Sequence, residues 1–232
     1  MKQNNNGFTL IEVLAVIAII SILATLLTPS IGGLLERARR TRVSNNMRQI
    51  VIAYQNFVNS SGSAKELRTA NRLAEWASIL AHHTGMNDAS LYIISEDYLA
   101  EADSRPIPKS IGNYRNGSWE MADDFSSYPL SLTVIVGISP GASPSTTPFA
   151  YTRGLDAQTG RWKKSIGPAG SVYGEKGGLV VFLDGHVEFF EFFDSKNPPF
   201  LRYDNGTPTT DIRQAVNPGA KAINWNGTAW GN

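Results

Sequence analysis

Glu12 is the residue whose type and position most clearly suggest chemistry, because it interrupts an apolar run over residues 8–27. An unpaired carboxylate in a hydrocarbon environment costs several kcal/mol, so such a residue usually has a partner and a function. Glu12 also lies near the start of the run, where its side chain could reach out to a polar boundary. The residues alone leave both interpretations open.

Other reactive side chains form no recognisable catalytic set. Asp184, His186 and Glu188 alternate around a tight Asp-Gly turn and could ligate a metal, but the turn explains Asp184 without one. His82 and His83 are adjacent, so they do not share a helix face. The chain has no cysteine, which excludes disulfides, thiol catalysis and cysteine-bound metals. It also lacks a phosphate-binding glycine loop and the common hydrolase motifs. We therefore expect no enzyme activity, no cofactor and no metal.

Length and charge limit the remaining classes. The 232 residues are enough for one globular domain and an N-terminal extension. The 21 Lys and Arg residues balance 20 Asp and Glu residues, so no nucleic acid partner is predicted.

The apolar run has the length of a membrane span. Twenty helical residues cover about 30 Å, the thickness of a bilayer core. A secretory signal would have a shorter apolar core and a cleavage site behind it. A buried core helix would be striped, whereas residues 13–27 are apolar on all faces. We expect a transmembrane helix over residues 8–28.

The stretch Gly7-Phe8-Thr9-Leu10-Ile11-Glu12 resembles the processing site of type IV prepilins and type II secretion pseudopilins. Asn6 departs from the basic residue that usually precedes the glycine. The resemblance implies cleavage between Gly7 and Phe8 by a prepilin peptidase and N-methylation of Phe8. It implies that Glu12 pairs with the amine of a neighbouring subunit. Pro29 falls where such helices often carry a kinking proline.

The resemblance implies a pilin-like α+β fold, in which a long N-terminal helix packs on a small antiparallel β-sheet head. We expect a leader at 1–7, a membrane and filament helix at 8–28, its amphipathic continuation at 29–60 and a head at 61–232. The implied function is a structural subunit of a pilus-like filament. The absence of cysteine favours a type II secretion pseudopilin. The alternative is a type IV pilin or a minor tip subunit that binds cargo, DNA or a surface.

The implied partners are prepilin peptidase, other pilin-like subunits, the bacterial inner membrane and secreted cargo. Arginines follow the span at Arg37, Arg39, Arg40 and Arg42, and counting charges would place this side in the cytoplasm. The resemblance instead implies that the head lies on the periplasmic side. A solvated helix face is the simplest interpretation of the arginines.

Periodicity predicts the elements of the head. Apolar residues recur at helical spacing at Val43, Met47, Ile50, Tyr54 and Phe57, and a second helix is expected over 64–83. Asp88 could cap a further short helix that ends near residue 100. Strands are expected at 130–136, 149–153 and 161–164, with a loop rich in Gly, Ser, Thr and Pro at 137–148.

The clearest hairpin joins residues 179–183 to 186–190 through Asp184 and Gly185. The Asp-Gly pair favours a two-residue type I′ turn, which would set Phe182 opposite Val187. This region resembles the C-terminal part of bacterial prepilin-type proteins with a terminal Asp-Gly hairpin. One such group has a histidine ten residues before the aspartate, where this chain has Gly174. Residues 191–232 contain many Asn, Gly and Pro, and we expect a loosely packed tail.

Overall fold

The computed structural model describes residues 9–61, 65–165 and 170–231, although within 26–32 it describes only the backbone. The first helix, α1 (Leu10–Ser61), extends across two compact units, Met1–Arg42 and Val43–Asn232. The second unit therefore contains part of α1 together with the residues expected to form the head. The reason is that one face of α1 supplies core residues: Val43, Met47, Ile50, Val51 and Phe57 are buried, in agreement with their spacing.

Two short helices replace the single helix expected over 64–83. They are α2 (Lys65–Thr69) and α3 (Leu73–Thr84), and Arg72 between them is extended, with φ −132° and ψ 149°. Gly85 ends α3 in the left-handed region at φ 74°, and its N–H donates to the Ala81 carbonyl at 2.9 Å. The 3₁₀ helix η1 (Ala89–Tyr92) is capped by Asp88, whose side chain accepts from the Ser90 N–H. The helices α4 (Tyr98–Ala102) and α5 (Asp123–Ser127) follow.

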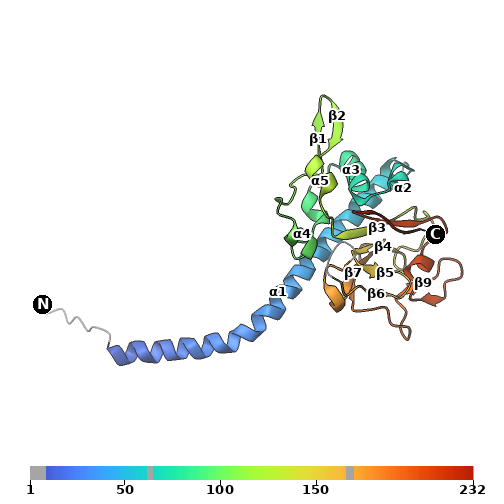
Figure 1. Ribbon diagram of the computed structural model, residues 1–232. Coiled ribbons are helices and arrows are strands. Elements are labelled where there is room, and N and C mark those ends of the chain that lie inside the picture. The colour runs from blue at the N-terminus through green and yellow to red at the C-terminus, as the bar shows by residue number, and fades with distance from the viewer. Residues whose placement is uncertain (1–8, 62–64, 166–169, 232) are drawn as a thin grey trace. The chain divides into compact units, whose positions relative to one another are not determined.

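A six-stranded antiparallel sheet forms the centre of the second unit (Figure 1). Its spatial order is β12 (Gly227–Gly231), β11 (Lys221–Asn224), β3 (Leu132–Val136), β4 (Pro148–Thr152), β7 (Gly178–Phe182) and β8 (Val187–Phe190). Every residue of β3, β4 and β7 is buried, which explains why these strands are apolar without alternation. The expected α+β class is confirmed.

Three smaller antiparallel pairs and two more 3₁₀ turns complete the unit. The pairs are β1 (Gly112–Arg115) with β2 (Ser118–Met121), β5 (Leu155–Asp156) with β6 (Arg161–Trp162), and β9 (Phe200–Leu201) with β10 (Pro208–Thr209). The 3₁₀ turns are η2 (Gly174–Lys176) and η3 (Ile212–Ala215). The β1–β2 pair was not expected from the sequence.

The expectation of a loose tail over residues 191–232 is wrong. Strand β11 pairs directly with the central strand β3, and β12 pairs with β11. Large apolar side chains of this region lie in the core, among them Phe193, Phe200, Ile212 and Ile223. The aliphatic residues are few, but long-range pairing buries them.

The β7–β8 hairpin also differs from the expected register by one residue. Val181, not Phe182, pairs with Val187, and the Phe182 N–H donates to the His186 carbonyl at 3.0 Å. The loop therefore contains Leu183, Asp184 and Gly185. Only Gly185 is left-handed, at φ 87°, as in a three-residue loop with glycine at its last position. Phe182 consequently shares a face with His186, and their rings stack at 4.1 Å.

We predict that the buried Asp97–Arg153 ion pair is a large stability determinant. The Arg153 Nη2 and Asp97 Oδ1 atoms are 2.5 Å apart, and the two side chains are only 3% and 1% exposed. Arg153→Met leaves the Asp97 carboxylate buried without its cation, so the free energy of unfolding should fall by about 3–5 kcal/mol. Urea denaturation followed by tryptophan fluorescence measures this. Arg115→Met is the control, because Arg115 and Glu120 form an exposed pair at 3.9 Å and should contribute less than about 1 kcal/mol. Equal losses in the two variants would contradict the prediction.

Candidate functional site

The N-terminal segment is the first candidate site. Gly7 and Phe8, the residues of the expected cleavage site, lie outside the described residues. Pro29 lies within α1, but its side chain is not described, so the kink expected there stays a prediction. The described part of the chain contains no helix that is both long and apolar enough to cross a membrane. The span expected over residues 8–28 is thus not confirmed.

Glu12 forms a reciprocal cap with Thr9 at the start of α1. Glu12 Oε2 accepts hydrogen bonds from the Thr9 N–H and from Thr9 Oγ1, each at 2.8 Å. In return, the Glu12 N–H donates to Thr9 Oγ1 at 3.4 Å. This arrangement is a capping box, which satisfies N–H groups that the first helical turn would leave unpaired. The sequence signal for this cap is a threonine followed three residues later by a glutamate, a pattern that the expectations for Glu12 did not include.

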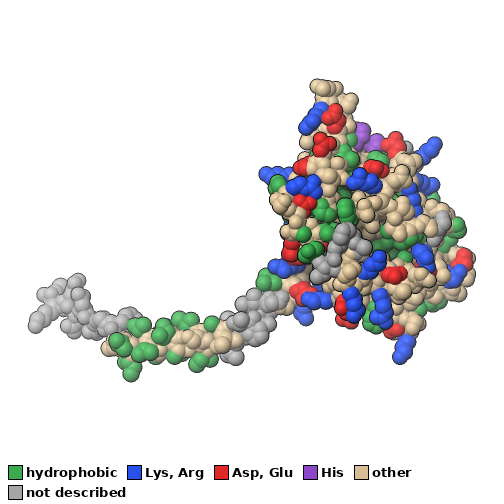
Figure 2. Space-filling view, viewed as in Figure 1, with side chains coloured by type: hydrophobic (Ala, Val, Ile, Leu, Met, Phe, Trp, Pro, Cys, Tyr) green, Lys and Arg blue, Asp and Glu red, His purple; other side chains and the backbone are tan. Residues whose placement is uncertain are grey.

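The segment around Glu12, from Leu10 to Leu23, exposes apolar side chains all round the helix. Its large apolar residues are each at least 51% exposed: Leu10, Ile11, Val13, Leu14, Val16, Ile17, Ile19, Ile20, Ile22 and Leu23. Figure 2 shows such side chains along this part of α1. A soluble helix would confine them to one stripe. An exposed apolar surface of this extent marks a contact with a membrane or with other protein chains.

The two hydroxyl residues in this segment do not disturb its apolar character. Ser21 Oγ donates to the Ile17 carbonyl at 2.7 Å, and Thr25 Oγ1 donates to the Ser21 carbonyl at 2.5 Å. Both hydroxyls are therefore satisfied inside the helix. This matters in an apolar environment, where no water is present to pair with them.

The arginine cluster begins about two turns after Pro29. Arg37, Arg39 and Arg42 are exposed on α1, and Arg40 is half-buried. Arg40 Nη2 forms an ion pair with Glu36 Oε1 at 2.6 Å, one helical turn away. At 3.6 residues per turn these four arginines point to different sides of α1, so charge surrounds the helix after its exposed apolar segment.

The Asp184–Gly185 turn has a structural role in the head. Arg48 Nε donates to the Gly185 carbonyl at 3.0 Å, and Gln55 Nε2 donates to the Leu183 carbonyl. Asp184 Oδ1 accepts from the His186 N–H at 3.0 Å and lies 2.5 Å from His186 Nδ1. The polar groups of this turn thus bond within the turn, to α1 and to the segment before β4, where the Pro144 and Thr147 carbonyls accept from the Asp184 and Leu183 N–H groups.

The adjacent histidines have separate partners. His83 Nε2 lies 3.2 Å from Glu66 Oε2, and its ring stacks on Phe57. The His82 ring stacks on Trp119, with centroids 5.7 Å apart. Among the residues that the structure describes, no three His, Asp or Glu side chains converge in a way that could hold a metal ion.

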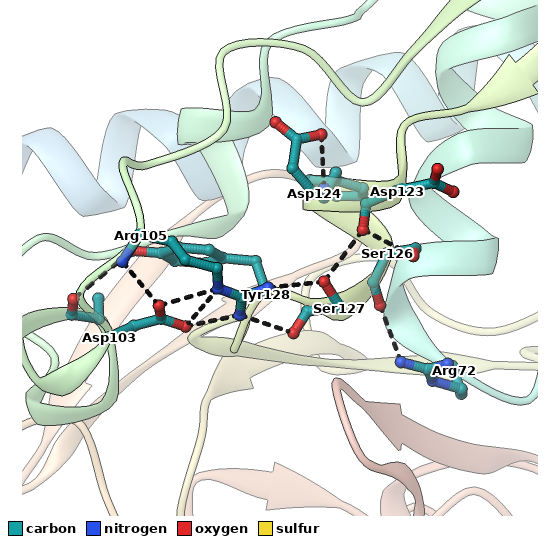
Figure 3. A network of polar contacts seen from close by, with 10 residues as sticks. Arg72, Asp103, Arg105, Asp123, Asp124, Ser126, Ser127 and Tyr128 are labelled. Atoms are coloured by element: carbon teal, nitrogen blue, oxygen red, sulfur yellow. Dashed lines mark hydrogen bonds and ion pairs between the residues drawn. The ribbon is translucent and has the colours of Figure 1, made fainter.

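A polar network around Arg105 joins the end of α4 to α5 (Figure 3). Arg105 Nη2 lies 2.6 Å from Asp103 Oδ2, while Arg105 Nη1 donates to Ser127 Oγ at 2.7 Å. The guanidinium carbon also lies 5.5 Å from the centre of the Tyr128 ring. Hydrogen bonds from the Arg105 side chain and N–H lower the pKa of Asp103 to about 2. The network links segments about twenty residues apart, so no local sequence pattern indicates it.

We predict that Asp103 stays ionised until the pH falls to about 2. Its unfolded pKa is about 3.9, so its contribution to stability is complete above that pH and disappears as the pH drops toward 2. In Arg105→Gln the folded-state pKa should rise toward 3.9. Side-chain carboxyl NMR shifts followed against pH measure both values. Arg115→Gln serves as the charge-matched control and should leave the Asp103 titration unchanged, whereas an unshifted titration in Arg105→Gln would refute the assignment.

Comparison with known proteins gives one match. A protein-family model described as the prokaryotic N-terminal methylation motif matches residues 2–28. No curated protein and no solved structure matches the chain. The matched residues include the expected cleavage site, the Thr9–Glu12 cap and the exposed apolar segment, so all three belong to one recognised motif. Residues 2–28 are thus the prepilin-type cleavage and methylation motif that type IV pilins and pseudopilins carry.

Proposed function

We propose that this chain is a structural subunit of a pilus-like filament. The observation that carries the proposal is the methylation motif, whose helical part exposes its large apolar side chains from Leu10 to Leu23. Such a surface is stable only beside lipid or beside similar helices. A subunit that is first anchored in a membrane and then joins a filament uses the same apolar helix surface in both environments. The proposed anchor is residues 8–28, in the bacterial inner membrane, with the head on the periplasmic side.

The specific system that we propose is type II secretion, in which the chain acts as a pseudopilin that contributes to protein export. The absence of cysteine favours this choice, because many pilins close a C-terminal loop with a disulfide. The partners would be prepilin peptidase, other pilin-like subunits and secreted cargo. The proposal assigns no catalytic step to the head.

The second candidate function is a type IV pilin or a minor tip subunit with a binding role. The β1–β2 hairpin favours it, because Tyr114 there is 63% exposed while its base is fixed. Asn87 Oδ1 accepts from the Ile111 and Gly112 N–H groups, each at 2.9 Å, and Trp119 Nε1 donates to Ser78 Oγ at 2.9 Å. Rigid, exposed aromatic residues are common in binding surfaces. Abundance separates the candidates, since a tip subunit is scarce and a shaft subunit plentiful.

We predict cleavage between Gly7 and Phe8. N-terminal sequencing and mass spectrometry of the membrane-extracted protein should find a chain that starts at N-methylated Phe8. Gly7→Val should abolish cleavage, because a branched side chain changes the backbone at the scissile bond. Asn6→Lys is the control and should be cleaved at least as well, since family members usually carry a basic residue there. A mature chain that starts at Met1 would disprove the processing proposal.

We predict that filament assembly requires the charge of Glu12 and not only its cap. Glu12→Gln keeps a side chain that can form the capping box but removes the charge. If the carboxylate pairs with the Phe8 amine of a neighbouring subunit, the loss of its charge should lower the filament yield by about tenfold or more. A tenfold fall corresponds to a loss of about 1.4 kcal/mol of binding free energy at each subunit contact. Sheared filaments quantified by immunoblot give the yield.

The matched control is Thr9→Val, which removes the hydroxyl from the cap and keeps the charge. It should assemble nearly normally, and membrane insertion should be intact in both variants. The opposite pattern, with normal yield for Glu12→Gln and a loss for Thr9→Val, would show that Glu12 is only a helix cap.

A further inference from the structure

We propose that a cavity in the head binds an apolar carboxylic acid, either a small molecule or the C-terminus of a polypeptide with an apolar last side chain. The cavity has a volume of about 330 Å³ and lies wholly within the Val43–Asn232 unit. It is bounded by the C-terminal end of α1, by α2, by the loop over residues 137–147 and by the β7–β8 turn. Its size is at the lower end of the range for small-ligand sites.

Apolar groups form most of the cavity wall. Ile138 and Ala142 are buried, Val58 and Leu183 are half-buried, and two prolines of the loop lie at the exposed rim. The Tyr54 ring adds an aromatic surface, fixed by contacts with Phe149 and Trp76 at centroid distances of 4.7 and 6.3 Å. A wall of this kind removes an apolar side chain from water and so favours an aliphatic or aromatic ligand group.

The positive charge of the cavity lining favours a negatively charged ligand. Arg68 is its only charged lining residue and has no ion pair with a carboxylate among the described residues. Asp184 is close in sequence to Leu183, but its carboxylate contacts His186. Burial raises the pKa of Tyr54, and the positive charge of Arg68 opposes that rise. The electrostatic effect of Arg68 therefore extends to the Tyr54 side chain on the cavity wall. A guanidinium donates two parallel hydrogen bonds to a carboxylate, which makes this anion the best match.

The walls of the cavity are held in place without a ligand. Asn217 accepts from the Ser139 N–H at 2.7 Å and donates to the Gly137 carbonyl at 3.0 Å. The Leu183 N–H donates to the Thr147 carbonyl at 3.0 Å, which fixes the other end of the loop. The site is therefore preorganised, and binding would cost little loop entropy.

The test uses two pairs of probes with the full-length chain in a non-ionic detergent. One pair is 3-phenylpropionate and its neutral amide, and the other is the peptide Ala-Ala-Phe with a free or an amidated C-terminus. Backbone amide NMR shifts of Ile138, Ala142 and Leu183 report binding. We expect saturable shifts with at least one free acid and binding at least about tenfold weaker for its amide.

Three variants locate the binding. Arg68→Gln should weaken acid binding by about tenfold or more, whereas Lys65→Gln, which makes the same charge change on the same short helix, should not. Ala142→Phe fills the cavity and should abolish binding while the remaining spectrum stays folded. Binding of 3-phenylpropionate supports a small acid as the ligand, and binding of the free peptide alone supports a polypeptide terminus.

The proposal is overturned if neither acid gives saturable shifts, if acids and amides bind equally, or if Arg68→Gln binds like the wild type. These outcomes are independent of filament assembly, because the cavity contains no residue of the N-terminal motif.

Discussion

The head depends on the burial of one face of α1. Met47, Ile50, Val51 and Phe57 are each no more than 3% exposed, so this part of the helix is a core element and not an attachment. Burying four such side chains contributes on the order of 6–12 kcal/mol before conformational entropy is subtracted, comparable to the net stability of a whole domain. Other features build on this contact. Tyr54 packs on Phe149 of the central sheet, and Arg48 and Gln55 hold the β7–β8 turn.

The same helix has a different requirement at its other end. There the apolar side chains are exposed on all sides, and the two hydroxyl residues bond to the helix backbone. This composition is unfavourable in water and favourable in lipid or among similar helices. The Thr9–Glu12 cap shows how one carboxylate can cap a helix terminus and still be available for an ion pair with a second partner. A carboxylate has about four lone-pair sites, and the cap uses only one of its two oxygens in the described contacts.

The head combines a rigid scaffold with exposed side chains that contribute little to the stability of that scaffold. The buried Asp97–Arg153 pair and the Arg105 network tie loops to the sheet and to α5. By contrast, Tyr114 on the β1–β2 hairpin and Arg68 at the cavity contribute little to the core. Exposed aromatic and arginine side chains on a fixed scaffold are the features that binding surfaces use. A filament subunit with such a head could form contacts beyond those needed for polymerisation.

The sequence by itself determined the features that depend on neighbouring residues. The apolar run, the buried face of α1 and the strands at β3, β4, β7 and β8 all follow from local composition and periodicity. The Gly7-Phe8 pair carries the resemblance to a prepilin processing site, which is also a local sequence feature. Tertiary structure alone decided three others. Strands β11 and β12 are short and contain Asn and Gly, so they depend on pairing: β11 pairs with β3, about ninety residues earlier, and β12 pairs with β11. The β7–β8 register shifted by one residue because Asp184 did not adopt the positive φ that a two-residue turn requires. The cavity beside Arg68 exists only because four distant segments meet there, and no local pattern encodes such a meeting.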